Sequence, residues 1–204
     1  MKIIKINGID PETDKIEIAK NFLKQGKLVV YPTDTVYGIG ANIFNDEAVL
    51  KVYSMKKRPK TKPLSICLSK IDDIKNVAHL DGTTEEIIEK ILPGPFTIIL
   101  KKKDVVSPVL TAGTDKIGIR IPDNQLCMKL AEDFPITSTS ANLSGHEVPN
   151  SSTGVLKQLG SAVDLLLDAG ICKHGLHSTV VDMTGENPKI LRIGAGYNII
   201  SDIL

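Results

Sequence analysis

The chain has 204 residues, of which 42% are hydrophobic and 24% charged, as in ordinary globular proteins. Its net charge of +1, from 25 basic and 24 acidic residues, excludes a protein coated with positive charge for DNA, so any anion site must concentrate charge locally. An aromatic content of 4%, without Trp, argues against a surface that stacks nucleic-acid bases.

The cysteines and the N-terminal residues predict a cytoplasmic protein. Cys67, Cys127 and Cys172 are far apart and form no CxxC pair, which favours free thiols in a reducing compartment. Residues 1–7 alternate charged and apolar side chains, unlike a signal peptide. No stretch of the sequence is long and apolar enough for a membrane span.

Hydrophobic patterning and breaker residues predict interspersed helices and strands. Helices are expected at residues 10–25, from 46 onward, and at 83–92, 125–133 and 152–160. Strands are expected at residues 28–31, 64–68, 96–100, 117–121, 136–138, 165–167, 179–183 and 189–193. Asp10, Thr83 and either Ser152 or Thr153 are the expected N-caps. Without a strict βαβ rhythm, the pattern predicts one α/β domain, 1–204, around a mixed twisted sheet.

A hydroxyl-rich and glycine-rich segment, residues 31–40, directly follows the first predicted strand. Strand ends of this kind often carry ligand contacts in open α/β sheets. Thr33 and Thr35 project to the same side if the backbone stays extended. The same residues also suit an ordinary polar turn.

A basic segment follows the helix that begins at residue 46. Five cations fall between Lys56 and Lys62, and Pro59 and Pro63 stiffen the segment. A fixed Lys and Arg pair suits polyphosphate, because Arg forks onto phosphate oxygens and Lys adds a point charge. A solvated helix end, where cations suit the helix dipole, and a general nucleic-acid patch remain open alternatives.

Two further features point to anion recognition. Residues 138–145 place four hydroxyls and an amide before a glycine, which suits carboxylate, ribose or phosphate binding as well as simple turns and caps. Arg120 lies within an apolar strand, so Arg120 and Arg192 each require an acidic partner or an anionic ligand. His174 and His177, three apart in a glycine-containing loop, are a poor metal scaffold, and no protein metal site is expected.

Six motifs in order resemble the YrdC/Sua5 family over residues 28–192. They are Pro-Thr-Asp-Thr-Val-Tyr-Gly, Lys-x-Arg-Pro with Lys-Pro-Leu, Pro-Gly-Pro-Phe-Thr, Arg-x-Pro, Ser-Thr-Ser-Ala-Asn-x-Ser-Gly and Ser-Thr-Val-Val-Asp. The resemblance implies a YrdC-like single domain, an open twisted mixed sheet flanked by helices around a positively charged cavity. It also implies a nucleotidyltransferase that joins L-threonine, bicarbonate and ATP into L-threonylcarbamoyladenylate and pyrophosphate. A separate complex would then transfer the threonylcarbamoyl group to adenosine 37 of tRNAs.

The resemblance assigns roles to particular positions of this chain. The implied catalytic residues are Lys56, Arg58, Ser140 and Asn142. The implied threonine-binding residues are Thr33, Thr35, Lys62, Arg120, Ser140 and Ser178. The implied ATP-binding residues are Lys56, Arg58, Asn142, Asn150 and Arg192. Mg²⁺ is expected to arrive bound to the ATP phosphates, with few or no protein ligands.

The sequence departs from the family pattern at Lys116, where a small or hydroxyl residue is expected, and at Asn150, where serine is common. Some members also carry an additional C-terminal domain, which we do not expect in this chain. The principal alternative function is a double-stranded RNA or tRNA-binding module without turnover, whose affinity would fall steeply with salt. Carbamoyl transfer as in hydrogenase-maturation proteins and a regulatory nucleotide-binding fold are further alternatives.

Overall fold

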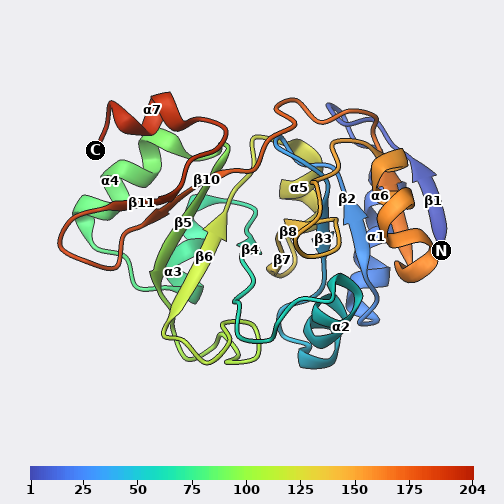
Figure 1. Ribbon diagram of the computed structural model, residues 1–204, viewed down its shortest axis with the longest axis horizontal. Helices are drawn as coiled ribbons and strands as arrows, with labels where there is room; N and C mark the ends of the chain where they lie inside the picture. The colour runs from blue at the N-terminus through green and yellow to red at the C-terminus, as the bar shows by residue number, and fades with distance from the viewer.

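The computed structural model describes residues 1–204, the side chain of Ser161 excepted, and folds the chain around two mixed sheets that lie side by side (Figure 1). The five-stranded sheet has the order β1 (Lys2–Lys5), β9 (Leu165–Asp168), β2 (Val29–Tyr31), β3 (Gly38–Gly40) and β8 (Thr139–Ser140). The six-stranded sheet has the order β11 (Lys189–Arg192), β10 (Thr179–Asp182), β5 (Phe96–Lys101), β6 (Lys116–Arg120), β4 (Ile66–Cys67) and β7 (Ile136–Thr137). The α/β class is confirmed, whereas the sequence predicted one sheet.

The two sheets meet at Ser138, between β7 and β8. The sequence predicted one strand over residues 136–138, but Ile136–Thr137 pairs with β4 and Thr139–Ser140 pairs with β3. Thr137 links the two sheets, because its Oγ1 donates to the oxygen of Ile39 at 2.7 Å. One short segment therefore leaves the six-stranded sheet and joins the five-stranded one.

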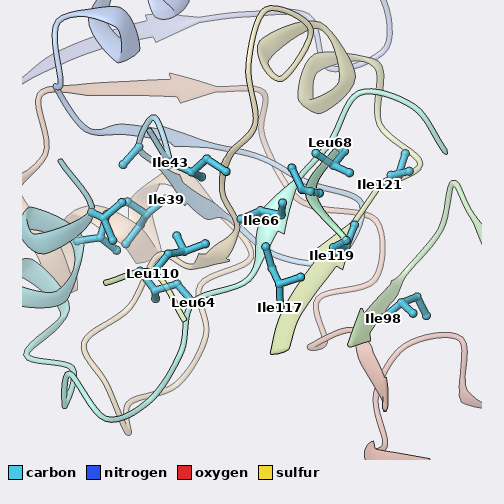
Figure 2. Packing of buried hydrophobic residues seen from close by; sticks show 14 of the residues in the cluster. Ile39, Ile43, Leu64, Ile66, Leu68, Ile98, Leu110, Ile117, Ile119 and Ile121 are labelled. Atoms are coloured by element: carbon cyan, nitrogen blue, oxygen red, sulfur yellow. The ribbon is translucent and has the colours of Figure 1, made fainter. Parts of the chain in front are cut away.

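Alternation along β5 and β6 separates a core face from a polar face. Ile98, Ile117 and Ile119 are buried in the core, and Figure 2 shows Ile117 and Ile119 beside Ile66 of β4, with Ile98 on the other side of Ile119. Because successive residues of a strand point to opposite faces, Gly118, together with Lys116 and Arg120, faces away from this core. That other side carries Thr97, Ile99, Lys116, Gly118 and Arg120.

Helices cover the faces of the sheets. The sheet-flanking helices are α1 (Thr13–Lys24), α2 (Asp46–Lys56), α3 (Ile74–Val77), α4 (Gly82–Ile91), α5 (Gln125–Leu130), α6 (Ser152–Leu159) and α7 (Tyr197–Ser201). Leu23 of α1 and Leu130 of α5 pack with Val29 and Tyr31 on one face of β2. Val30, on the opposite face of β2, belongs to the larger core that both sheets share. No helix in the described residues is long and apolar enough to cross a membrane.

Three predicted N-caps were wrong by one or two residues. Helix α1 begins at Thr13 rather than near Asp10, since Asn7 accepts the backbone N–H of Asp10 in a preceding turn. The Asp81 carboxylate, rather than Thr83, caps α4 by accepting the N–H of Thr84 at 2.8 Å.

Helix α6 begins at Ser152, as the predicted range has it, but its N-cap differs. Its cap is Ser151, whose hydroxyl accepts the N–H of Gly154, rather than Ser152 or Thr153. In both α4 and α6 another residue within two positions also has a capping side chain, and the surrounding loop decides which one lies outside the first turn.

Candidate active site

A cavity of about 650 Å³ lies between the two sheets. Its floor is the polar face of β5, β6, β10 and β11, and its far wall is built by the Ser140–Asn142 segment and the end of α2. Six cations line it, against the single carboxylate of Asp182 among the lining residues that the structure describes. The cations are Lys56, Arg58, Lys62, Lys116, Arg120 and Arg192.

Lys56 is the last residue of α2 and is 1% exposed. Its ammonium donates to the backbone oxygen of Asn142 at 2.8 Å, to the side-chain oxygen of Asn142 at 3.0 Å, and to the backbone oxygen of Ser140. Burial, reinforced by the nearby guanidinium of Arg58, lowers the pKa of Lys56 to about 7. The protonated form of Lys56 is surrounded by neutral oxygens, so an anion in the cavity can offset its charge.

Arg58 is held against the proline-containing turn that follows α2. Its Nε donates to the oxygen of Lys62 at 3.1 Å, and its Nη2 donates to the oxygen of Pro63 at 2.8 Å. Lys57, in a left-handed conformation with φ of 49°, turns the chain so that Lys56 and Arg58 both reach the cavity. The basic segment is thus a fixed wall of the cavity at these positions rather than a solvated helix end.

The Ser140 and Asn142 side chains form one hydrogen-bonded unit with Lys56. Ser140 Oγ donates to Asn142 Oδ1 at 2.6 Å, and Asn142 Nδ2 donates to the oxygen of His146 at 2.7 Å. Gln158 of α6 supports this loop from behind, accepting the N–H of Leu143 and donating to the oxygen of Glu147. Sequence reasoning missed Gln158, since nothing in its local pattern distinguishes it from other polar helix residues.

Arg192 and Ser178 meet at the β10–β11 end of the cavity. Arg192 Nε and Nη2 donate to the Ser178 oxygen at 3.1 and 2.9 Å, and Nη2 also lies 3.0 Å from Ser178 Oγ. Ser178 Oγ bonds Thr97 Oγ1 at 2.8 Å, so Ser178 is fixed from two sides. The guanidinium therefore contacts neutral oxygens and keeps its charge available to the cavity.

Arg120 and Lys116 differ from the other cavity cations because each has a carboxylate partner. Arg120 Nη2 lies 2.9 Å from Asp34 Oδ1, and Lys116 Nζ lies 2.9 Å from Asp182 Oδ2. In the described part of the chain, no carboxylate pairs with the remaining cavity cations, which are Lys56, Arg58, Lys62 and Arg192. These four concentrate the charge that the overall net charge of +1 hides.

The structure places three of the expected site residues away from the cavity surface. Thr33 and Thr35 are buried, 2% and 0% exposed, and lie behind Arg120, to which Thr35 is hydrogen-bonded. Asn150 is exposed in a loop, where its backbone oxygen accepts the N–H of Cys172. The expected residues that line the cavity are Lys56, Arg58, Lys62, Arg120, Ser140, Asn142, Ser178 and Arg192.

His177 also lines the cavity, although no sequence motif predicted this position for it. Partial burial and the positive charges of Arg192, Lys56 and Arg120 lower its pKa, so His177 is neutral at pH 7. The cysteines are buried free thiols, as predicted. The described residues contain no group of three or more His, Cys, Asp or Glu arranged to hold a metal ion.

Comparison with known proteins places this architecture in one family. Residues 21–194 match the model of the Sua5/YciO/YrdC family, whose description is "Telomere recombination". The chain therefore belongs to the Sua5/YciO/YrdC family. The predicted resemblance is confirmed.

Individual relatives add detail. A protein from Methanocaldococcus jannaschii is 42% identical over 197 residues, covering 96% of this chain and 93% of the relative. The threonylcarbamoyl-AMP synthase of Pyrococcus abyssi is 37% identical over 88% of this chain, which spans 54% of that enzyme. The crystal structure of P. abyssi Sua5 complexed with L-threonine superposes with a TM-score of 0.92 at 36% identity, covering 95% of this chain and 58% of that one.

Proposed function

We propose that this chain is a threonylcarbamoyl-AMP synthase, a nucleotidyltransferase that makes L-threonylcarbamoyladenylate and pyrophosphate from L-threonine, bicarbonate and ATP. The observation that carries the proposal is the cluster of cavity cations without carboxylate partners, with Lys56 held among the oxygens of Ser140 and Asn142. Its relatives include the P. abyssi enzyme of that name.

The reaction joins two anions, so the cavity must offset negative charge. The threonine amine condenses with bicarbonate, releasing water and forming a carbamate. A carbamate oxygen then bonds to the α-phosphorus of ATP, and the bond to the β-phosphate oxygen breaks to release pyrophosphate. Lys56, Arg58 and Arg192 stabilise the charge that develops on these phosphates. Arg120, Ser140 and Ser178 orient threonine.

The donor set of the cavity fits a magnesium ion carried by the nucleotide. Asp182, the carboxylate of the cavity lining, already accepts from Lys116 at 2.9 Å and from Thr184 at 2.6 Å. Mg²⁺ prefers phosphate oxygens and water as ligands, and when bound to ATP it would neutralise part of the phosphate charge. We further propose that the adenylate product passes to a separate threonylcarbamoyl transferase complex that acts on tRNA.

Pyrophosphate release tests the proposal. Purified protein with ATP and Mg²⁺ is assayed with and without threonine and bicarbonate, beside Lys56→Ala and the control Lys60→Ala. Lys60 is an exposed cation of the same segment that does not line the cavity. We expect release that requires both co-substrates, is lost in Lys56→Ala and survives in Lys60→Ala.

The opposite outcome is equally defined. Absence of release under every condition, with nucleotide binding intact, would overturn the synthase assignment. Salt-dependent binding of duplex RNA would then be measured to test the binding-module alternative.

A further inference from the structure

Asp34 links the two sheets across the base of the cavity. It lies in the loop between β2 and β3 of the five-stranded sheet, and its side chain is fully buried. Its Oδ1 accepts from Arg120 of β6 at 2.9 Å, and its Oδ2 accepts the N–H of Asp123 at 3.3 Å. A buried carboxylate thus fixes one sheet against the end of a strand in the other.

The hydrogen bonds of Arg120 leave one guanidinium nitrogen for a ligand. Nη2 donates both to Asp34 Oδ1 at 2.9 Å and to Thr35 Oγ1 at 2.8 Å. Nε is buried without a partner in the described structure. Since Arg120 lines the cavity, Nη1 is the nitrogen that remains to meet an anion there.

Thr33 and Thr35, the two threonines behind Arg120, both use their hydroxyl protons in hydrogen bonds within the protein. Thr33 Oγ1 donates its proton to the oxygen of Val36 at 2.7 Å. In the 2.9 Å contact between the two hydroxyls, Thr35 must therefore be the donor to Thr33. The chain of bonds runs from Arg120 through Thr35 and Thr33 to the backbone, so Thr35 acts as an acceptor that further fixes Nη2.

We propose that Asp34 is a positioning residue for the substrate carboxylate, which it serves by holding Arg120 with Nη1 toward the cavity; this rests on the proposed function. A free arginine samples many rotamers, and its affinity for a carboxylate falls when those rotamers must be frozen on binding. Asp34 and Thr35 hold Arg120 in one rotamer before the ligand binds. Asp34 also neutralises Arg120, so orientation rather than surplus charge selects the ligand at this end of the cavity.

Titration calorimetry with the full chain tests this role without requiring turnover. L-threonine and L-threoninamide, which lacks the carboxylate, are compared as ligands of the wild type, Asp34→Ala and Asp34→Asn. We expect the wild type to prefer threonine at least tenfold. Asp34→Ala should reduce that preference to threefold or less, and Asp34→Asn should restore part of it, because the asparagine oxygen can still accept from Arg120. ATP affinity should change by less than twofold.

The matched control is Asp133→Ala, which breaks an ion pair to the buried Lys20, 3.0 Å away and outside the cavity lining. It should destabilise the fold and leave the preference for threonine intact. Full preference in Asp34→Ala, or a parallel loss of affinity for threonine, the amide and ATP, would overturn the positioning role. If Asp34→Ala does not fold, Asp34→Asn decides: a preference two- to fivefold below wild type supports the proposal, and an unchanged or larger one contradicts it.

The two proposals fail separately. A wild type that releases pyrophosphate but does not discriminate threonine from its amide removes the role of Asp34 and leaves the synthase assignment. A wild type that discriminates threonine from its amide but does not release pyrophosphate removes the synthase assignment and leaves the role of Asp34 in binding threonine.

Discussion

The ammonium of Lys56 lies 3.0 Å from the side-chain oxygen of Asn142, and the same oxygen accepts a 2.6 Å bond from Ser140. Lys56 is more than 80 positions from both Ser140 and Asn142 in sequence, yet the three residues form one unit in which a nearly fully buried lysine has no carboxylate partner. Burial, together with the nearby charge of Arg58, lowers the pKa of Lys56 to about 7.

The lowered pKa of Lys56 predicts that ATP binding takes up a proton. The polyphosphate favours the charged form of Lys56 and raises its pKa in the complex. Above pH 7 the free protein holds Lys56 increasingly neutral, so ATP affinity should fall several-fold between pH 7 and pH 9, at most roughly tenfold for each pH unit. Calorimetry in buffers of different ionisation enthalpy measures the proton uptake.

Lys56→Met provides the control for this pH dependence. The uptake above pH 7 should disappear in this variant, whose side chain cannot titrate. His177 also lines the cavity, and burial and the nearby cations lower its pKa, so any proton uptake by His177 would persist in Lys56→Met. Equal proton uptake in the wild type and Lys56→Met would assign the effect to another group.

Unpaired and paired cations of the cavity should contribute unequally to ATP binding. Arg192 contacts the neutral oxygens of Ser178, whereas the charge of Lys116 is offset by Asp182 at 2.9 Å. Arg192→Ala should therefore raise the Kd for ATP about tenfold or more, and Lys116→Ala by no more than about threefold. Equilibrium dialysis at two salt concentrations measures both, and equal losses would refute the distinction.

Gln158 should affect nucleotide affinity although it does not line the cavity. Its amide holds the loop after Asn142 at two points, the N–H of Leu143 at 3.1 Å and the oxygen of Glu147 at 2.7 Å. Gln158→Ala should raise the KM for ATP several-fold while changing the free energy of unfolding by about 1 kcal/mol, the net value of ordinary hydrogen bonds. Steady-state kinetics and urea unfolding test this; a KM equal to that of the wild type would contradict it.

Gly194 should not tolerate a side chain. A Cβ at this position would lie 2.7 Å from the oxygen of Ser178 and closer still to that of His177. Because both contacts are to backbone oxygens, and that of Ser178 accepts from Arg192, Gly194→Ala should lower the free energy of unfolding by about 1–3 kcal/mol. Gly82→Ala is the control, since its Cβ meets nothing within 4 Å. Urea denaturation of both variants gives the comparison, in which similar stabilities would exclude the steric argument.

Local pattern predicted most elements but not those that depend on distant partners. Strand β1 (Lys2–Lys5) was missed because its pairing with β9 spans some 160 residues, and its own sequence mixes charge with apolar groups. Strand β3 (Gly38–Gly40) was missed because two glycines weaken any strand pattern. It forms because Ile39 is buried between β2 and β8.

The sequence by itself determined the α/β class, the family and the identity of the charged and hydroxyl-bearing residues, because motif order and hydrophobic period are properties of the chain. The tertiary structure decided which of those residues share a cavity, which cations carry a carboxylate partner, and that Thr33 and Thr35 stand behind Arg120. The Lys116–Asp182 and Arg120–Asp34 pairs join residues 66 and 86 positions apart. These pairings depend on how the two sheets pack against each other. The same packing sets how deeply each charged group is buried and how strongly it interacts with its neighbours.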